Sequence, residues 1–476
     1  MVRKIILIKL KKFFLGKMKK TIFVIISSRY YYKYITNKCF LQLERKYKVY
    51  YLFKDTNFFK KNLKVKNKIF YKLDEKSSVW TNYFLKYLRF SNDKKCKTFK
   101  AMGDWAFPTY SGLKQIFKQE KKKESFFISY LSVVFKKLIM RILSTKYLSD
   151  IFTDFFYKKI LIEKNFNNIF SKYKPDLVIY PTHSKEPEVI KIKKLSDFHK
   201  FKTFYIIDNW DNLSTGTYYK YKPDFIGVWG KQTKMHAVKI HNFTKKNVFL
   251  IGNCRFDNYF RLKKENFVKN NKNYILFVAA KIRVDEIYYL KLLNRVLTEN
   301  KKIFKNTKIV YRLHPQDKNL EILKNLRNLE NVLIDKTVFS DNQIPYFKND
   351  LNILKKNYIP LLINAKFIVG CISSVIIEGL IFNKSYLAIA FKKKNDEFYN
   401  PQWWFKNFIH LSGIENVNNV KLSFNEKQYE KMFVQMFKNS KLKKNYSKTK
   451  RQLDYFYHKD KLPYDKKILE CVEKIF

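Results

Sequence analysis

Residues 175–252 decide the fold, and they contain four short apolar runs: PDLVIYP (175–181), KTFYIID (202–208), PDFIGVWG (223–230) and NVFLIG (247–252). Two amphipathic runs separate them, EVIKIKKLSDFHK (188–200) and KQTKMHAVKIHNF (231–243). Short apolar runs that alternate with helical runs of about 10–15 residues predict right-handed βαβ units. The segment therefore predicts a parallel sheet covered by helices.

The same alternation restarts after the charged segment RLKKENFVKNNKN (261–273). Its predicted strands are YILFVAA (274–280), TKIVYRLHP (307–315), NVLID (331–335), KFIVG (366–370) and SYLAIAF (385–391), with helices at 286–297, at 351–365 and from Ser374. Further predicted strands lie upstream at 21–27, 48–53 and 68–73, with a helical stretch at 30–43. Two βα series joined by a linker predict an α/β protein of two Rossmann-like, doubly wound domains with an interdomain cleft.

The predicted boundaries follow from these series. We expect a basic amphipathic N-terminus at 1–20, a first domain at 21–262 with a helical insertion at 80–172, and a second domain at 273–476. A chain of 476 residues is too long for one compact core. Its hydrophobic fraction of 46% provides enough apolar surface for two.

The formal net charge of +58 raises the question of an anionic partner. The positive residues are mostly Lys scattered along the whole chain, which favours compositional bias over a dedicated nucleic-acid role. No basic run is interleaved with Gly and aromatic residues, as it often is in nucleic-acid-binding segments. We therefore do not expect nucleic acid as a partner.

The cysteines and the N-terminal segment indicate where in the cell the protein is located. The five cysteines are far apart and form no CxxC pair, so neither a zinc site nor a disulfide framework is indicated and a reducing cytoplasm fits. No stretch reaches the roughly 18 apolar residues of a membrane span. The opening MVRKIILIKLKKFFLGKMKK (1–20) is either an amphipathic helix on an anionic membrane or a poorly ordered or edge-strand N-terminus. The predicted location is cytoplasmic. If residues 1–20 form the amphipathic helix, we also expect peripheral contact with the inner face of the cytoplasmic membrane.

Two polar motifs follow predicted strands of the second domain. The first is His314, whose imidazole could donate to a phosphate or nucleotide oxygen. The second is the pair Ser373 and Ser374 at the start of a helix, where hydroxyls and backbone N–H groups suit a phosphate. Glu378, one turn into that helix, could accept from ribose hydroxyls. A structural histidine and a simple Ser N-cap are the alternative interpretations.

These motifs resemble those of a known superfamily. RLHP (312–315) and CISSVIIEG (371–379) look like the HP and SS motifs of bacterial GT-B sialyltransferases and polysialyltransferases, Kdo transferases and CDP-glycerol glycerophosphotransferases. The stretch from 206 to 260 also resembles the end of the N-terminal domain of surface-carbohydrate glycosyltransferases of that superfamily. The similarity covers roughly 175–390. The acidic D/E-D/E-G motif of sialyltransferases is not found, which argues against sialic acid.

The resemblance implies a GT-B fold with the nucleotide-sugar donor in the second domain, the acceptor on the first, and neither a metal nor a cofactor. Carried onto this sequence, it implies that His314, Ser373 and Ser374 hold the donor. Arg283, beside a predicted helix start, could neutralise a diphosphate, and we also assign Arg312 of RLHP to the predicted donor group.

The loop after the strand 202–207 is the candidate acceptor site. Asn209, Trp210 and Asn212 could bind the acceptor, since Trp stacks on a sugar ring and amides bind its hydroxyls. Asp208 or Asp211 is the candidate catalytic base, because transfer needs a group that removes the acceptor proton. An Asx-rich turn that caps local backbone is the alternative interpretation.

Two further features of the first domain are weaker candidates. His183, after the strand 175–181, is an alternative base or substrate ligand. The segment 252–257, GNCRFD, either lets the backbone approach the substrate or consists of ordinary turn and salt-bridge residues.

Together these observations predict a metal-independent glycosyltransferase that moves a sugar from a nucleotide-activated donor to a surface polysaccharide or lipid-linked glycan of the cell envelope. The chain has no GxxxxGK[ST] and no GxGxxG motif, which argues against an NTPase and a dinucleotide oxidoreductase. The alternatives are a CDP-glycerol-type polyol-phosphate transferase, a sugar-nucleotide epimerase, and a non-catalytic basic protein that binds nucleic acid or anionic lipid.

Overall fold

The computed structural model describes residues 19–57, 59, 63, 65–120, 125–265, 273–280, 284–314, 321–337, 354–394, 396, 400–441 and 446–476. Two of the predicted features lie outside these ranges. They are Arg283 and nearly all of the basic N-terminal segment 1–20.

The first sheet has seven parallel strands in the order β3-β2-β1-β4-β5-β6-β7. Their bounds are β1 Thr21–Ile26, β2 Lys48–Lys54, β3 Lys68–Tyr71, β4 Leu177–Thr182, β5 Lys202–Ile207, β6 Phe225–Val228 and β7 Val248–Leu250. The order reverses between β1 and β4, which is the Rossmann arrangement. β4 is buried along its whole length, because helices cover both faces of the sheet.

The second sheet repeats this plan with six parallel strands in the order β10-β9-β8-β11-β12-β13. The strands are β8 Tyr274–Val278, β9 Lys308–Arg312, β10 Val332–Ile334, β11 Ile368–Cys371, β12 Tyr386–Ile389 and β13 Val420–Ser423. Here the order reverses between β8 and β11. The predicted fold class, two Rossmann-like α/β domains in the GT-B manner, is confirmed.

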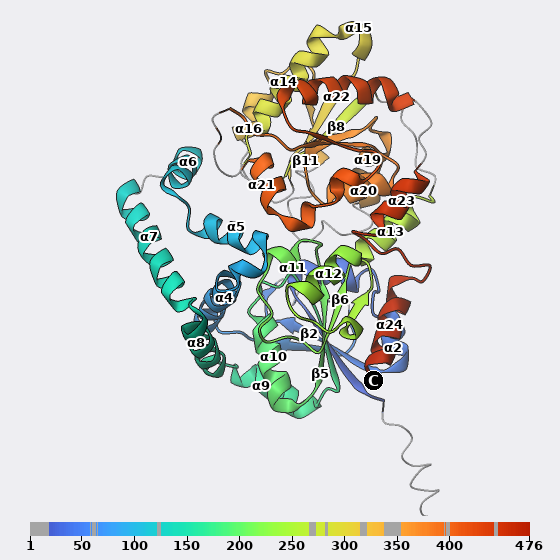
Figure 1. Cartoon of the computed structure of the whole chain (residues 1–476). Helices are drawn as coiled ribbons and strands as arrows, with labels where there is room; N and C mark the ends of the chain where they lie inside the picture. The colour runs from blue at the N-terminus through green and yellow to red at the C-terminus, as the bar shows by residue number, and fades with distance from the viewer. Residues whose placement is uncertain are drawn as a thin grey trace, which may run out of the picture.

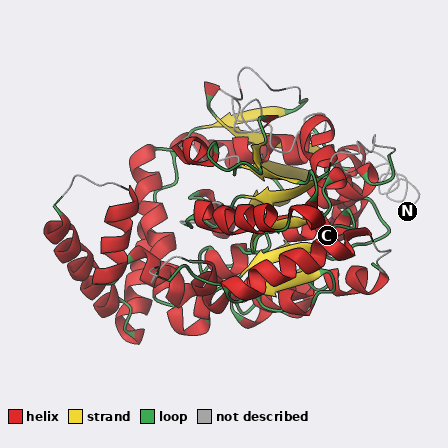
Figure 2. Cartoon of the chain, turned by 90° about the horizontal axis from the view of Figure 1, so that it is seen from above, coloured by secondary structure: helices red, strands yellow, loops and turns green. Residues whose placement is uncertain are grey.

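Helices cover both sheets, and the two domains lie one above the other (Figures 1 and 2). In the first half they are α2 Leu41–Lys46, α4 Glu75–Phe90, α5 Lys97–Ala106, α6 Tyr110–Glu120, α7 Phe126–Leu143, α8 Lys146–Lys159, α9 Lys164–Tyr173, α10 Glu188–His199, α11 Asn212–Thr215, α12 Lys231–Lys239 and α13 Cys254–Leu262. In the second half they are α14 Glu286–Glu299, α15 Lys301–Phe304, α16 Glu321–Leu326, α19 Ile359–Asn364, α20 Val375–Ile381, α21 Pro401–Asn407, α22 Glu426–Lys438, α23 Ser447–Leu453 and α24 Tyr464–Ile475.

The stretch 30–43, predicted as one helix, is divided in the structure. It contains the 3₁₀ turn η1 (Ser28–Tyr30), the π turn η2 (Tyr31–Ile35) and then α2. Lys38 separates η2 from α2, because its φ of 53° lies in the left-handed region and cannot continue a right-handed helix.

The C-terminal helix α24 returns to the first sheet. Ile468 and Val472 are fully buried in the same apolar cluster as Ile22 and Leu177 of β1 and β4. The Lys202 Nζ also donates to the Ile475 carbonyl at 2.6 Å. The last helix of the chain therefore packs on the first domain, a return that the sequence pattern did not predict.

The contact between the domains is apolar and extensive. One buried cluster joins Trp210, Trp229 and Phe256 of the first domain to Ile376 and Phe456 of the second half of the chain. Trp210 illustrates this contact, since its ring centroid lies 5.6 Å from the ring centroids of both His410 and Phe456. Burial of these large rings stabilises the packing of one domain against the other.

Three histidines are buried and neutral around this contact. Burial lowers the pKa of His236 to about 3 and those of His241 and His410 to about 4. The Nδ1 atom of His410 lies 2.9 Å from the Ser214 Oγ across the domain boundary. His241 Nε2 lies 2.7 Å from the Leu213 carbonyl and its Nδ1 accepts from the Tyr219 amide, which fits one neutral tautomer.

These histidines predict that stability falls as the pH is lowered from about 6.5 to about 4. Each folded pKa lies below that of the unfolded chain, so between the two values the unfolded chain binds more protons and is favoured. Each such histidine contributes a slope of about 1.4 kcal/mol per pH unit where its shift is fully expressed. Urea unfolding at several pH values measures the slope. His236→Met should reduce it, whereas His199→Gln, a control near the surface, should change it less, and equal slopes in all three proteins would contradict the prediction.

Candidate functional site

Both sheets have a topological switch point, and polar residues follow the strands that flank each one. In the first sheet the switch point lies between β1 and β4, and His183 follows β4. In the second sheet it lies between β8 and β11, and Ser373 and Ser374 follow β11. In open parallel sheets, ligands bind beyond the carboxyl ends of the strands at such points.

The loop after β4 holds a histidine–carboxylate pair. His183 Nδ1 lies 2.9 Å from Glu186 Oε2, and the His183 and Glu186 side chains are 20% and 14% exposed. Burial alone would raise the pKa of Glu186, but the hydrogen bond and charge of His183 and a bond from Thr182 lower it to about 2. Tyr30, from η1 after β1, donates to Glu186 Oε1 at 3.2 Å. The Tyr30–Glu186 hydrogen bond therefore crosses the switch point between β1 and β4.

The loop after β11 carries the serine pair on a closely packed base. A Cβ atom added to Gly370 would come within 2.5 Å of the Val278 carbonyl, so only glycine lets β11 approach β8 this closely. Ser374 is the N-cap of α20, and its hydroxyl makes no capping hydrogen bond. The Ser373 hydroxyl accepts from the Val375 amide at 3.4 Å. His314, which follows β9, is half-buried.

Asp208, a predicted base, is buried in an ion pair. Its carboxylate binds Lys33 Nζ, and the Tyr34 hydroxyl donates to the same oxygen at 3.3 Å. The Lys33 and Asp208 side chains are only 4% and 9% exposed. The Asp208 carbonyl accepts from Asn253 Nδ2 at 2.9 Å and from Trp229 Nε1 at 3.1 Å. These partners hold the end of β5 against η2 and the start of α13.

The other residues of that loop are also engaged by the fold. Asp211 is the N-cap of α11, and its Oδ2 accepts from the Thr215 hydroxyl at 2.8 Å. Asn209 donates its amide to Asn212 Oδ1 at 2.8 Å, which closes a local turn. Trp210 is 4% exposed within the domain contact. These contacts form a local polar turn at the start of α11, and the acceptor and base roles of its residues stay predictions.

A second buried ion pair joins the two domains. Arg255 of α13 places its Nη2 3.0 Å from Glu378 Oε1 of α20, and the side chains are 11% and 5% exposed. Burial alone would lower the pKa of Arg255, but the Glu378 carboxylate raises it above its ordinary value. The Tyr358 hydroxyl donates to the other Glu378 oxygen at 2.6 Å. Arg255 Nε has no hydrogen-bond partner among the described residues.

Polar contacts continue from Tyr358 into the second domain. The Arg312 guanidinium lies 4.9 Å from the centroid of the Tyr358 ring and forms a buried ion pair with Asp335. It also donates to the Thr337 hydroxyl at 3.1 Å. We call the whole series the interdomain polar chain: Lys33, Asp208, Asn253, Arg255, Glu378, Tyr358, Arg312 and Asp335.

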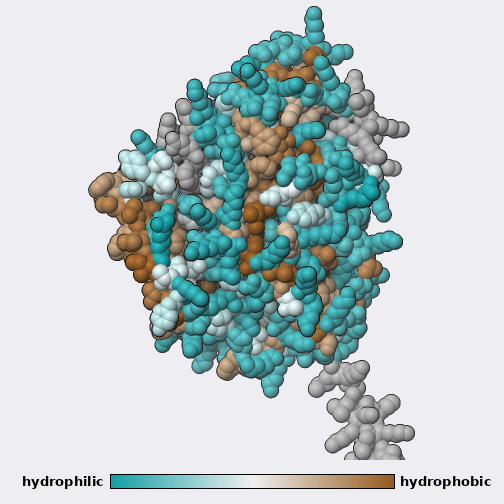
Figure 3. All heavy atoms as spheres, viewed as in Figure 1, coloured by the Kyte–Doolittle hydropathy of each residue, from teal (hydrophilic) through white to brown (hydrophobic). Residues whose placement is uncertain are grey.

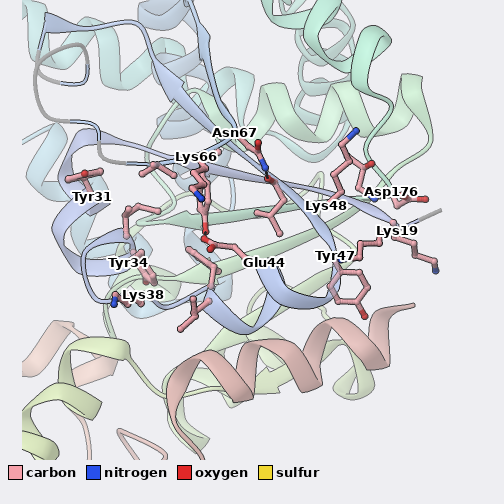
Figure 4. Close-up of a pocket in the computed structure, with 18 of the residues that line it drawn as sticks. Lys19, Tyr31, Tyr34, Lys38, Glu44, Tyr47, Lys48, Lys66, Asn67 and Asp176 are labelled. Atoms are coloured by element: carbon pink, nitrogen blue, oxygen red, sulfur yellow. Dashed lines mark hydrogen bonds between the residues drawn. The ribbon is translucent and has the colours of Figure 1, made fainter. Parts of the chain in front are cut away.

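A pocket of about 1170 Å³ lies elsewhere on the first domain (Figure 4). Its lining includes Thr21, Lys48 and Asp176, which lie at the amino ends of β1, β2 and β4. Asp176 already accepts from the Thr21 amide at 2.7 Å, and Glu44 accepts from the Tyr51 hydroxyl. None of the predicted site residues lines this pocket.

The described ranges contain neither a cluster of metal-binding residues nor a membrane-spanning helix. In those ranges, no group of three or more His, Cys, Asp or Glu residues could hold a metal ion. No helix within them is both long and apolar enough to cross a membrane.

Several partners in the site were not predicted from the sequence. Glu186 follows His183 by three residues, and that spacing was an available signal. Lys33 lies 175 residues from Asp208 in the sequence, so no local pattern connects them. Arg255 was noted only as an ordinary turn or salt-bridge residue, and its partner Glu378 belongs to the other domain.

Comparison with known proteins gives a fold-level result. No protein-family model and no curated protein sequence matches the chain. Among solved structures, the UDP-GlcNAc 2-epimerase from Neisseria meningitidis, bound to UDP-GlcNAc, is 11% identical with a TM-score of 0.49, over 95% of this chain and 100% of that one. The UDP-GlcNAc 2-epimerase from Methanocaldococcus jannaschii is 11% identical with a TM-score of 0.47, over 95% of this chain and 99% of that one.

A third similar structure, the UDP-N-acetylglucosamine 2-epimerase from Rickettsia bellii, is 11% identical with a TM-score of 0.44, over 96% of each chain. At these identities and TM-scores, the likeness carries no information on what this chain does. The resemblance of the HP and SS motifs to sialyltransferases, Kdo transferases and CDP-glycerol glycerophosphotransferases stays a prediction.

The Arg255–Glu378 pair generates a stability prediction. Glu378→Leu should lower the free energy of unfolding by about 3–5 kcal/mol, because it leaves the buried Arg255 charge uncompensated. The double substitution Arg255→Met, Glu378→Leu should be clearly more stable than the single one, since it removes both charges. Urea unfolding of the three proteins measures the difference. A double variant as unstable as the sum of both single variants would contradict the prediction.

Proposed function

We propose that this chain is an enzyme that acts on a nucleotide-activated sugar. In this proposal the nucleotide and its phosphates bind beside Ser373 and Ser374, and the sugar extends toward His183 and Glu186. His314 completes the proposed nucleotide side. Arg312 and Glu378, predicted for the same side, are already held in buried ion pairs, and Arg283 lies outside the described residues.

The observation that carries the proposal is the pair of switch points. Each Rossmann-like sheet offers one place for a ligand beyond its carboxyl edge, and here both edges meet at the domain boundary. The Arg255–Glu378 pair joins the segment after β7 to the helix after β11. Burial lowers the pKa of His410 in the second domain, the charge of Asp211 opposes this, and the charge of Lys185, in the loop after β4, lowers the pKa further. A nucleotide-activated sugar fits such a boundary, because its nucleotide can bind one domain while its sugar binds the other.

A buried positive charge at the domain boundary, that of Arg255 in α13, supports the binding of an anionic ligand there. Arg255 Nε is buried and has no hydrogen-bond partner among the described residues, so a phosphate oxygen would satisfy it. The Ser373 and Ser374 hydroxyls, just before the first residue of α20, offer neutral donors for phosphate oxygens. These groups could stabilise a diphosphate without a metal ion.

Among reactions of nucleotide-activated sugars, epimerisation fits this site better than glycosyl transfer, because the predicted acceptor loop is already bound by other residues. Asp208 is occupied by Lys33, Asp211 caps α11, and Trp210 is buried, so this loop offers little for an acceptor. The His183–Glu186 pair is more accessible and suits proton transfer, since the carboxylate orients the imidazole and stabilises its charge. In epimerisation by proton transfer, one sugar carbon loses a proton and regains one on its opposite face. The reaction therefore needs no acceptor molecule.

Nucleotide binding tests the substrate class. Titration calorimetry with UDP, CDP, CMP, GDP and ADP should show saturable binding of one nucleotide. The Ser373→Ala, Ser374→Ala double variant should weaken it by at least about tenfold, the worth of a hydrogen bond to a charged phosphate. Ser125→Ala removes an exposed N-cap serine far from both switch points and should bind as the unchanged protein does. No nucleotide binding, or binding that the double variant leaves unchanged, would overturn the proposal.

Product analysis tests the reaction. Incubated with the sugar form of the nucleotide that binds, the enzyme should yield a second sugar nucleotide, with no free nucleotide and no acceptor. In D₂O the inverted carbon should carry solvent deuterium, which ¹H NMR detects. His183→Gln should lower kcat by about 10²–10⁴ while nucleotide affinity is kept.

The other reactions give different products. Free nucleoside diphosphate that forms only with an added glycan acceptor would identify a glycosyltransferase, and CMP release from a CDP-polyol would identify a polyol-phosphate transferase. Full activity of His183→Gln would exclude His183 as the acid or base.

A further inference from the structure

Helix α7 exposes a continuous apolar face. The face begins with the adjacent residues Phe127 and Ile128 and continues at three- and four-residue intervals with Leu131, Phe135, Leu138 and Ile142. Each of the six side chains is between 51% and 69% exposed. No residue of this helix is buried. Figure 3 shows the brown side chains gathered at the edge of the molecule where Figure 1 places α7.

The opposite side of α7 is already packed, so this face is not the one that attaches the helix to the protein. The Phe126 and Tyr130 rings lie 5.1 and 5.3 Å from the Tyr110 ring of α6. The Tyr87 hydroxyl donates to the Leu143 carbonyl at 2.5 Å, which fixes the C-terminal end of α7 to α4. The apolar face of a helix is ordinarily buried against another element, and this face of α7 is exposed to solvent.

The charges beside this face are positive. Lys136 and Arg141 are exposed on α7, Lys146 begins α8 just beyond it, and the sequence of α7 contains no Asp or Glu. Such side chains can lay their apolar stems on the surface while their charged ends reach outward. The face therefore combines apolar contact with attraction for an anion.

We propose that the outer face of α7 docks onto an anionic lipid surface, with the helix lying in the plane of the interface. Its apolar side chains enter the boundary of the acyl chains, and Lys136 and Arg141 meet the lipid phosphates. The arm of α6, α7 and α8 stands out beside the body in Figure 1, which leaves this face accessible. The proposal does not depend on the reaction that the enzyme performs.

A second copy of the chain fits this face less well than a membrane. Each copy has a formal net charge of +58, so two copies repel one another, whereas an anionic bilayer attracts each of them. The positive residues that border the face would oppose each other in a symmetric dimer.

Vesicle co-sedimentation of the full chain tests the proposal. Vesicles of phosphatidylcholine with about 30% phosphatidylglycerol should bind the protein, and pure phosphatidylcholine vesicles should bind it much less. Leu131→Gln, Phe135→Gln should weaken binding at least about tenfold, because it removes two apolar anchors without changing the charge. Lys136→Gln, Arg141→Gln should reduce the preference for the anionic vesicles.

A matched control lies elsewhere on the surface. Leu131 and Phe135 are 51% and 63% exposed, and Leu333 and Phe198 are 52% and 73% exposed on β10 and α10. Leu333→Gln, Phe198→Gln therefore makes the same chemical change away from the arm and should bind vesicles as the unchanged protein does. All four substituted positions are exposed, so each variant should keep the urea midpoint of the parent.

Two alternative occupants are outcomes that would overturn the proposal. If vesicle binding is lost when residues 1–18 are removed but is kept by Leu131→Gln, Phe135→Gln, the N-terminal segment is the membrane contact. If the parent ignores vesicles and sediments as a dimer that the same double variant dissociates, the face joins two copies.

Discussion

The buried ion pair between Arg255 and Glu378 is the interaction on which the relation of the two domains depends. It joins α13, the last helix of the first domain, to α20, the helix that follows β11 of the second. Both side chains are removed from water, so each charge would be costly without the other. The pair therefore holds the carboxyl edges of the two sheets in one relative position.

The rest of the interdomain polar chain extends that constraint into each domain. On one side it passes through Asn253 to Asp208 and Lys33, and on the other through Tyr358 to Arg312. The same feature shapes the site, because Asp208 and Glu378 gain structural partners and lose some of their freedom as ligands. His183 and the serine pair stand outside the chain, and the functional proposal relies on them together with Nε of Arg255, which belongs to the chain.

The helical insertion at 80–172, which contains α5 and the arm of α6, α7 and α8, serves the protein in two ways. Through α5 it contacts the second domain, since Trp105 packs on Trp404 with ring centroids 4.6 Å apart and the Thr98 hydroxyl donates to the Asn407 carbonyl at 3.1 Å. Through α7 it presents an apolar face away from the core. An insertion that contacts the second domain through α5 and a lipid surface through α7 would connect that surface to the domain boundary, where the proposed substrate binds.

The sequence by itself determined the two βα series, because a parallel strand buried on both faces must be apolar and its covering helix must be amphipathic. It also indicated Ser373 and His183, which follow strands at the switch points. Only the tertiary structure decided that Asp208 binds Lys33 and that Glu378 binds Arg255, because each pair joins residues far apart in the chain. The same holds for α24 on the first sheet and the open face of α7, since periodicity shows that a face is apolar but not what covers it.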